Sequence, residues 1–252
     1  MLLNARQIIW EGLADRRWSA AQLESFQLRL QDLSLLADLQ RPLRLEQASI
    51  NQLFVGLHRN PAMVKPWRFG PGLGNALLPG FLWLMPSGWM YLEQTSYHHA
   101  FEDKLLPVLN IETGRIQPSI IHTHPNSAFW HHHLLSDVLL QSFEGLLTRA
   151  ALAQTGKNQA LLACALERYR LANGQFPKTL EALTPQFIES IPTDPISGKP
   201  MIYRCARGDR FLLYSVGWNE KDDDGKAIMT KDGKAPIATE GDWVWPKYPE
   251  ED

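Results

Sequence analysis

The segment between Asn158 and Gly217 constrains the fold of this 252-residue chain more than any other part. It begins with a helical pattern, in which apolar residues recur at the spacing of one helix face. We expect the helix to end at Asn173-Gly174, because glycine can adopt the left-handed conformation that closes a helix. The pattern therefore predicts a helix from about residue 158 to residue 173, with a buried face formed by Leu162, Ala165, Leu166 and Tyr169.

Turn signals follow this helix at short intervals and delimit two strands. Ser197-Gly198 and Gly208-Asp209 are dipeptides typical of turns. The second strand ends at Gly217, where an acidic loop begins, because glycine can adopt backbone conformations that other residues avoid. The elements predicted between these turns are a short helix over 179–183 and strands over 201–204 and 210–216.

The first 60 residues carry three helical patterns with short connections. Ser19 and Gln22 have the spacing of a capping box, which predicts the start of the second helix. The apolar stripe of this helix continues over residues 23–37. Arg41-Pro42 opens the third helix, because proline is tolerated in the first helical turn, and that helix is expected to end near residue 60.

Two more helices are predicted between residues 87 and 153, separated by a turn at Thr113-Gly114. Ser87 is a candidate cap for the first, which reaches about residue 106, and the second begins near residue 128. His98 and His99 lie on the first of these helices. We identify no carboxylate partner for them at helical spacing and expect structural or surface roles.

These patterns together predict an α+β protein with two domains. An all-helical region over residues 1–150, as all or part of a longer helical domain, precedes a second domain over residues 151–252. The helical stripes of the first region are expected to form its core.

Charge and cysteine content exclude several function classes. The 25 basic and 27 acidic residues leave no field that would attract nucleic acid, and no Lys/Arg run is present. Cys164 and Cys205 are too few for a disulfide scaffold and lack the spacing of a redox or zinc motif. A single disulfide bond between them is possible in an oxidising compartment, but we expect two buried thiols.

Five of the eight histidines fall within residues 119–137. His122 and His124 alternate, so on a strand both imidazoles would face one side and could share a zinc ion. The His-x-His-Pro sequence resembles the signature of JAMM-type zinc isopeptidases, but Ser136 stands where that family has its ligand Asp. The alternative function is a zinc-dependent hydrolase, in which His122 and His124 would bind the ion together with the neighbouring Asp137.

The C-terminal motifs resemble a secretion family. The series "NGQFP", "DPISGKP" and "LYSVG", with strands and a short helix between them, is similar to the C-terminal half of the major pseudopilins of type II secretion systems. The resemblance covers about residues 155–245 and implies a pilin-like helix with a small antiparallel sheet. The whole chain also resembles uncharacterised envelope proteins of Verrucomicrobia-like bacteria.

The pseudopilin resemblance implies a calcium ion in the loop after "LYSVG". Calcium binds six to eight hard oxygen ligands, which acidic loops supply. The family usually has Asp where Asn219 stands, and the segment over 226–240 is longer here. The implied ligands are the carbonyl oxygens of Leu213 and Ser215 and the side chains of Asn219, Asp222, Asp223, Asp224 and Asp242.

The leading functional hypothesis is a non-enzymatic protein of the cell envelope. The resemblance implies an assembly or recognition role linked to secretion, with protein partners and a location on the periplasmic or extracytoplasmic side. Pseudopilins polymerise through a long apolar N-terminal helix, which has no counterpart in this sequence. We expect a membrane anchor upstream of the chain, and the alternative is that the pilin-like unit serves as a plain folding module.

Overall fold

A computed structural model describes residues 9–33, 35–60, 87–122, 134–206, 210–232 and 236–245. The α+β class is confirmed, because helices are combined with small antiparallel sheets. Two compact units are present. The sheet unit comprises Met1–Ala37, Val108–Ser119 and Gly145–Asp252, and the helical unit comprises Asp38–Pro107 and Ile120–Glu144. The domain boundary expected at residue 150 falls inside helix α8 (Leu134–Asn173). The two compact units are each made of separate stretches of the chain and are divided at other residues.

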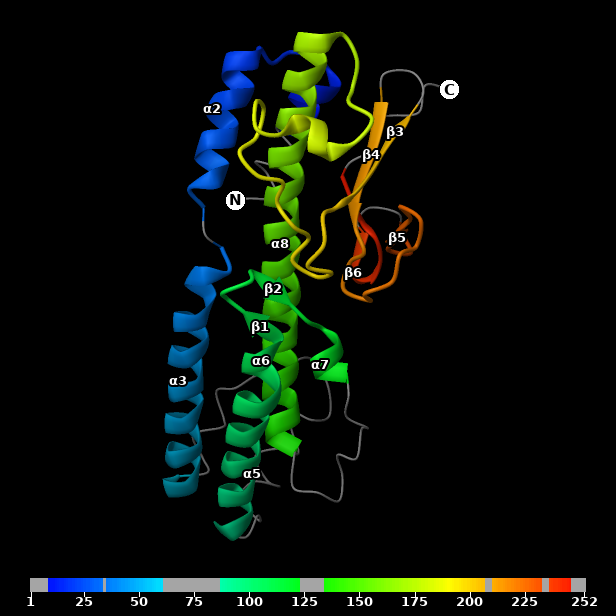
Figure 1. The fold of residues 1–252 in the computed structure, drawn as a ribbon. Coiled ribbons are helices and arrows are strands. Elements are labelled where there is room, and N and C mark those ends of the chain that lie inside the picture. Colours follow the sequence, from blue (N-terminus) through cyan, green and yellow to red (C-terminus); the bar gives the residue numbers. More distant parts are fainter. Residues whose placement is uncertain are drawn as a thin grey trace. The chain divides into compact units, whose positions relative to one another are not determined.

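The helical unit is built on α3 (Gln40–Arg59) and α5 (Ser87–Ala100), which lie side by side (Figure 1). The third predicted helix is confirmed, with Asn60 as its C-cap. The π-helical turn η3 (Phe101–Leu105) and α6 (Leu106–Val108) continue α5. Aromatic rings pack between these elements. The ring centroid of Tyr97 lies 5.8 Å from those of Phe54 and Phe101, and the rings of Phe101 and Phe143 meet edge to face with centroids 5.3 Å apart.

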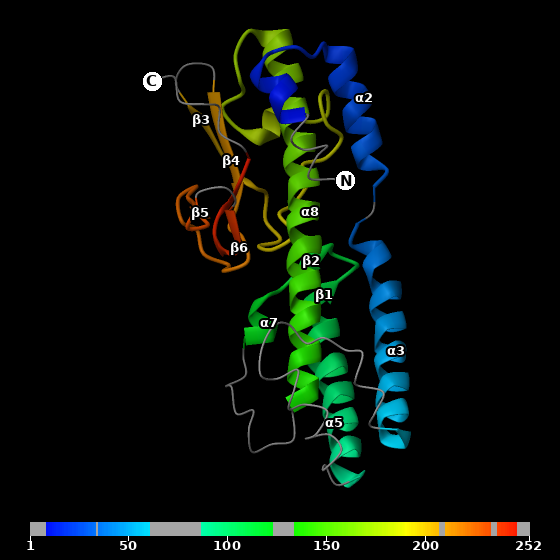
Figure 2. The ribbon, with the colours of Figure 1, turned by 180° about the vertical axis from the view of Figure 1, so that it is seen from behind.

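The sheet unit is organised around the second half of α8 (Leu134–Asn173). Helix α2 (Ala20–Gln31) runs along one side of this stretch, and strands β3 (Ile202–Ala206) and β4 (Arg210–Ser215) lie along another (Figures 1 and 2). Leu162 and Leu166 of α8, Leu23 of α2 and Leu213 of β4 belong to one buried cluster. The core therefore lies between the helix and the sheet, as the C-terminal pattern predicts.

In the part of the chain that the structure describes, three small antiparallel sheets have the orders β1-β2, β3-β4-β7 and β5-β6. Their strands are β1 (Leu109–Asn110), β2 (Arg115–Ile116), β3 (Ile202–Ala206), β4 (Arg210–Ser215), β5 (Ala227–Met229), β6 (Pro236–Gly241) and β7 (Trp243–Val244). The predicted strands 201–204 and 210–216 correspond to β3 and β4. The turn predicted at Thr113-Gly114 is also confirmed, and Gly114 has a φ of 62°.

The capping box of α2 is confirmed in detail. Ser19 accepts a hydrogen bond from the backbone N–H of Gln22, and the Gln22 side chain accepts one from the Ser19 backbone N–H at 2.9 Å. The helix ends at Gln31, however, before the predicted end of the stripe at residue 37. Leu33 is 39% exposed, and a separate 3-10 turn, η1 (Ala37–Leu39), leads into α3.

A single helix replaces the two that were predicted around residues 128–153 and 158–173. The chain continues as α8 through residues 154–157, where Gly156 is the only helix-breaking residue and weakens a helix by only about 1 kcal/mol. Gln154 donates a hydrogen bond to Asn158 across this stretch at 3.0 Å, and Thr155 is fully buried. Tertiary packing therefore holds the helix continuous. Its predicted end at Asn173-Gly174 is confirmed, with Gly174 at a φ of 78°.

The exposure of the two cysteines differs from expectation. Both thiols are free, and Cys164 is buried in α8 whereas Cys205 is exposed on β3. The prediction of two buried thiols is therefore wrong for Cys205, which lies near the end of its strand. Among the described helices, none combines the length and apolar character needed to cross a lipid bilayer.

Candidate metal centre

The acidic loop lies between β4 and β5 and returns to Asp242, the residue between β6 and β7. Gly217 starts this loop with a φ of 69°. A Cβ atom at Gly217 would lie 2.3 Å from the carbonyl oxygen of Gly241, so the two backbones can approach only because residue 217 is glycine. This approach brings the start of the loop beside the end of β6.

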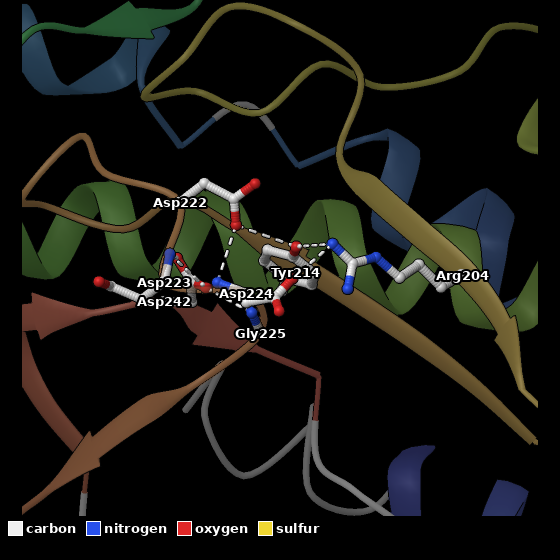
Figure 3. Close-up of polar contacts among 7 residues, drawn as sticks. All are labelled: Arg204, Tyr214, Asp222, Asp223, Asp224, Gly225 and Asp242. Carbon is white, nitrogen blue, oxygen red and sulfur yellow. Dashed lines mark hydrogen bonds and ion pairs between the residues drawn. The ribbon is translucent and has the colours of Figure 1, made fainter.

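Asp242 is the buried carboxylate of the loop, with a relative exposure of 1%. Its oxygens accept backbone N–H bonds from Asp223, at 3.2 and 3.1 Å, and from Gly225 at 2.7 Å (Figure 3). Burial raises the pKa of Asp242, and the negative charges of Asp222 and Asp223 raise it further, while the two backbone donors oppose the shift. The Asp242 carboxylate thus accepts hydrogen bonds from two backbone N–H groups, but the nearby charges of Asp222 and Asp223 repel its ionised form.

Asp222 and Asp224 belong to a second network, which links the loop to the outer face of the sheet (Figure 3). The Tyr214 hydroxyl donates to Asp222 at 3.0 Å, and burial raises the pKa of Tyr214 to about 12. Arg204 forms an ion pair with Asp224 at 2.7 Å and also donates to the Tyr214 oxygen at 3.3 Å. Asp224 donates its backbone N–H to Asp222 at 2.9 Å.

The start of the loop is fixed by side chains as well. Asn219 donates to Asp223 at 2.9 Å and accepts the backbone N–H of Lys221 at 3.2 Å. Glu220, at a φ of 57°, accepts the backbone N–H of Ser119 at 3.0 Å. Ser119 is the first residue of α7 (Ser119–His122), so the loop also caps a short helix from an earlier part of the chain.

The structure brings together only some of the seven residues predicted as calcium ligands. Asp222, Asp224 and Asp242 lie in connected hydrogen-bond networks, and Asn219 joins them through Asp223. The other two face the sheet. The carbonyl oxygen of Leu213 accepts the backbone N–H of Trp245 at 2.8 Å, and the hydroxyl of Ser215 donates to Asp194.

The residues present fit calcium in their donor chemistry. Carboxylate and amide oxygens are the hard ligands that calcium prefers, and a carboxylate that accepts one or two N–H bonds keeps further acceptor capacity. In the described part of the chain, no three His, Cys, Asp or Glu side chains form a preformed metal cage. The residues that could hold calcium are Asp222, Asp223 and Asp242, with Asn219 as a fourth oxygen ligand, whereas Asp224 is paired with Arg204.

Asp194 is a buried structural residue beside the loop that the sequence analysis did not single out. It is 1% exposed and accepts hydrogen bonds from the backbone N–H of Ile196 at 3.0 Å, from the Ser197 hydroxyl at 3.0 Å and from the Ser215 hydroxyl at 2.8 Å. The available signal was the Asp-Pro-x-Ser turn, in which Asp commonly caps its own turn. Arg204 and Tyr214 were also missed, because their meeting depends on the cross-strand register.

The zinc alternative falls mostly outside the described residues. His124 and the side chains of His122 and Asp137 are not described, so this hypothesis stays a prediction. The local geometry assumed for it is wrong at His122, which ends the helix α7 and does not belong to a strand. The alternation argument for two imidazoles on one face therefore does not apply there.

The statement that His98 and His99 lack carboxylate partners at helical spacing is also wrong. The Nδ1 atom of His99 lies 3.7 Å from a carboxylate oxygen of Asp103, four residues later, and both side chains are 71% exposed. His98 lies within 3.3 Å of the Gln47 amide, which also donates to Glu102 at 2.8 Å. The i,i+4 spacing of His99 and Asp103 is visible in the sequence.

Comparisons with known proteins give no match, whether to a family model, to a curated protein or to a solved structure. The resemblance to pseudopilins therefore depends on the C-terminal motifs and remains a prediction.

Proposed function

We propose that this chain is a non-enzymatic protein of the cell envelope, with an assembly or recognition role linked to secretion. Its sheet unit would be the pilin-like module, and a calcium ion would fix the loop after β4. The order of elements supports this proposal, since α8, the Asp194 turn, β3, β4 and the acidic loop follow one another as the resemblance implies.

The surroundings of Asp242 carry the calcium part of the proposal. Its carboxylate is buried, and the charges of Asp222 and Asp223 raise its pKa. A bound divalent cation would neutralise this repulsion and favour the ionised forms of all three groups. Calcium binding would move Asp222 from the Tyr214 hydroxyl to the ion, so a contact within the loop would replace this contact with the sheet.

Calcium titration tests this claim on the full chain. We expect the melting temperature to rise with calcium and to fall again on chelation, since an ion that binds only the folded state stabilises it. At 100 times the dissociation constant the gain is about 2.7 kcal/mol. Magnesium should have a smaller effect, because it demands a stricter octahedral geometry than this flexible loop offers.

Matched variants locate the ion. Asp242→Asn should abolish the calcium shift, whereas Glu240→Gln, at an exposed position two residues earlier, should leave it unchanged. Asp222→Asn serves as a second variant in case Asp242→Asn destabilises the fold. The absence of any shift at millimolar calcium in the parent chain would exclude the calcium site, as would an unchanged shift in both aspartate variants.

Cell fractionation tests the envelope assignment independently of calcium. An epitope-tagged chain expressed in its native host should be recovered with the envelope or periplasmic fraction. Crosslinking in those cells should capture it with envelope proteins. Recovery in the cytoplasmic fraction alone would contradict the proposed location and with it the proposed role.

A further inference from the structure

The register of β3 and β4 places Arg204 beside Tyr214 on one face of the sheet. Arg204 lies directly opposite Leu212, and residues two apart on a strand share a face, so Tyr214 is its diagonal neighbour. The Arg204 guanidinium lies 5.9 Å from the centroid of the Tyr214 ring and donates to its hydroxyl oxygen at 3.3 Å. Strand pairing therefore brings the Arg204 charge to the side chain that contacts Asp222.

Gly225 brings the acidic loop onto the same face of the sheet. It has a φ of 76°, and a Cβ atom here would lie 2.8 Å from Cδ2 of Leu212 and 3.3 Å from Cε1 of Tyr214. Glycine allows this close approach because it has no Cβ atom. The preceding residue, Asp224, forms its ion pair with Arg204 at 2.7 Å (Figure 3). Two backbone features, the strand register and the glycine, therefore bring the pair together.

Arg204 is a permanent positive charge beside the acidic loop. The loop and the residue on which it closes carry the carboxylates of Asp222, Asp223, Asp224 and Asp242. Within the described part of the chain, Arg204 is the one cationic side chain that forms an ion pair with any of these four. Arginine is not deprotonated in proteins, so this charge is present at every pH at which the chain is folded.

The ion pair changes what the loop offers to calcium. Calcium affinity depends on the number of charged ligands and on the rigidity of the site. Asp224 is bound through one oxygen to Arg204, and an ion at its other oxygen would be repelled by the nearby guanidinium. Three charged ligands remain, which are Asp222, Asp223 and Asp242.

We propose that Arg204 sets the calcium affinity of the loop, because its guanidinium competes with calcium for Asp224. This inference rests on the calcium site proposed above. In the calcium-free protein the ion pair holds Asp224 against the sheet and lowers the affinity for calcium. Arg204→Gln leaves Asp224 without this partner, so the loop gains a fourth carboxylate for calcium but loses a contact that holds it in the calcium-free state.

Isothermal titration calorimetry of the full chain with calcium chloride, after treatment with a chelator, tests the proposal. We expect Arg204→Gln to lower the dissociation constant by about tenfold, since one more charged ligand becomes free. Lys226→Gln is the matched control, because it removes the same charge from an exposed residue two positions after Asp224. Its dissociation constant should change by less than about twofold, because water and salt screen an exposed charge.

Thermal melting provides a second readout. Without calcium, Arg204→Gln should melt slightly below the parent chain, because an ion pair that fixes the loop is lost. At saturating calcium the order should reverse, since tighter binding to the folded state raises its stability. A general loss of stability would instead lower the melting temperature equally in both conditions and would contradict the proposal.

A second substitution tests whether Arg204 acts through Asp224. Asparagine tolerates the left-handed backbone at residue 224, which has a φ of 63°. Asp224→Asn in the Arg204→Gln background should therefore keep the fold and return the dissociation constant to within about threefold of the parent value. A tenfold gain that persists in the double variant would overturn the proposal, because Arg204 would then act only through its general charge.

The remaining outcomes separate this inference from the proposed function. Equal calcium affinity in the parent chain and in Arg204→Gln would overturn the inference alone. Absence of binding in both chains would exclude the calcium site and the inference together. Binding by Arg204→Gln alone would support the competition and show that Arg204 blocks the site in the parent, which contradicts calcium binding as part of the proposed function.

Discussion

The buried carboxylate of Asp194 accepts a hydrogen bond from the Ser215 hydroxyl at 2.8 Å, which joins the turn before β3 to the end of β4 across 21 positions of sequence. The same carboxylate accepts the backbone N–H of Ile196. Asp194 thus fixes the geometry of a turn and the point at which the acidic loop departs from the sheet.

Replacing Asp194 by Ala should destabilise the sheet unit by about 2–4 kcal/mol, because buried donors on Ile196 and Ser215 would lose their acceptor. Chemical denaturation measures this change. Ser197→Ala is the matched control, since it removes one partly buried donor to the same carboxylate and should cost about 1 kcal/mol. Equal effects of the two substitutions would show that Asp194 has no organising role.

Gly217 and Gly174 should respond differently to alanine, although both have positive φ angles of 69° and 78°. At Gly174 nothing lies within 4 Å of a Cβ atom, so only backbone strain of about 1–2 kcal/mol is expected. At Gly217 the Cβ atom would also collide with the Gly241 carbonyl, and we expect a loss of about 3 kcal/mol or more. Denaturation of the two variants side by side tests whether this close approach exists.

Glu102 should make the stability of the helical unit depend on pH. A hydrogen bond from Gln47, together with hydrogen bonding and charge from Arg44, lowers the pKa of Glu102 below its ordinary value of 4.5. A lowered folded-state pKa gives stability that is present above pH 4.5 and is lost as pH falls through the folded pKa. The difference in unfolding free energy between the parent and Glu102→Gln should therefore shrink on acidification.

This effect should be less than about 1 kcal/mol, because the Glu102 side chain is one-third exposed and water screens its charge. Asp103→Asn, at a neighbouring position that is 71% exposed, is the control and should show a smaller pH-dependent difference. Urea denaturation at neutral and acidic pH provides both measurements. A difference that stays constant with pH would contradict the predicted pKa shift.

The two thiols should differ in reactivity toward Ellman's reagent. Burial raises the pKa of Cys164 to about 12, so its thiolate is scarce at neutral pH, whereas Cys205 is exposed. We expect one rapidly reacting thiol per native chain and two after denaturation. Cys205→Ser should leave no rapidly reacting thiol, and a fast reaction in that variant would mean that the helix around Cys164 opens readily.

Local sequence signals predicted elements well where one residue type decides the backbone conformation. The capping pair Ser19 and Gln22 begins α2, and Gly174 ends α8, as expected. The signals failed where packing overrides propensity. Gly156 does not interrupt α8, because buried neighbours and a hydrogen bond from Gln154 to Asn158 hold the helix together.

The candidate site was predicted only in part for a related reason. The concentration of acidic residues in the loop was visible in the sequence, and the loop does close on Asp242, which accepts the backbone N–H groups of Asp223 and Gly225. The individual partners were not visible. Whether Asp224 meets Arg204 or an ion depends on strand register and on where each side chain finds a donor.

The sequence by itself determined the cap at Ser19, the helix end at Gly174, the pair of strands β3 and β4, the acid-rich loop and the α+β class, because each depends on residues close together along the chain. Tertiary structure alone decided which distant segments meet. Ile116 donates its backbone N–H to the carbonyl oxygen of Pro195, and Arg115 packs over Gly198, so the β1-β2 hairpin joins the sheet unit and not the helical unit. Contacts of this kind arise from burial and from pairing of polar groups across the fold, for which local spacing carries no information.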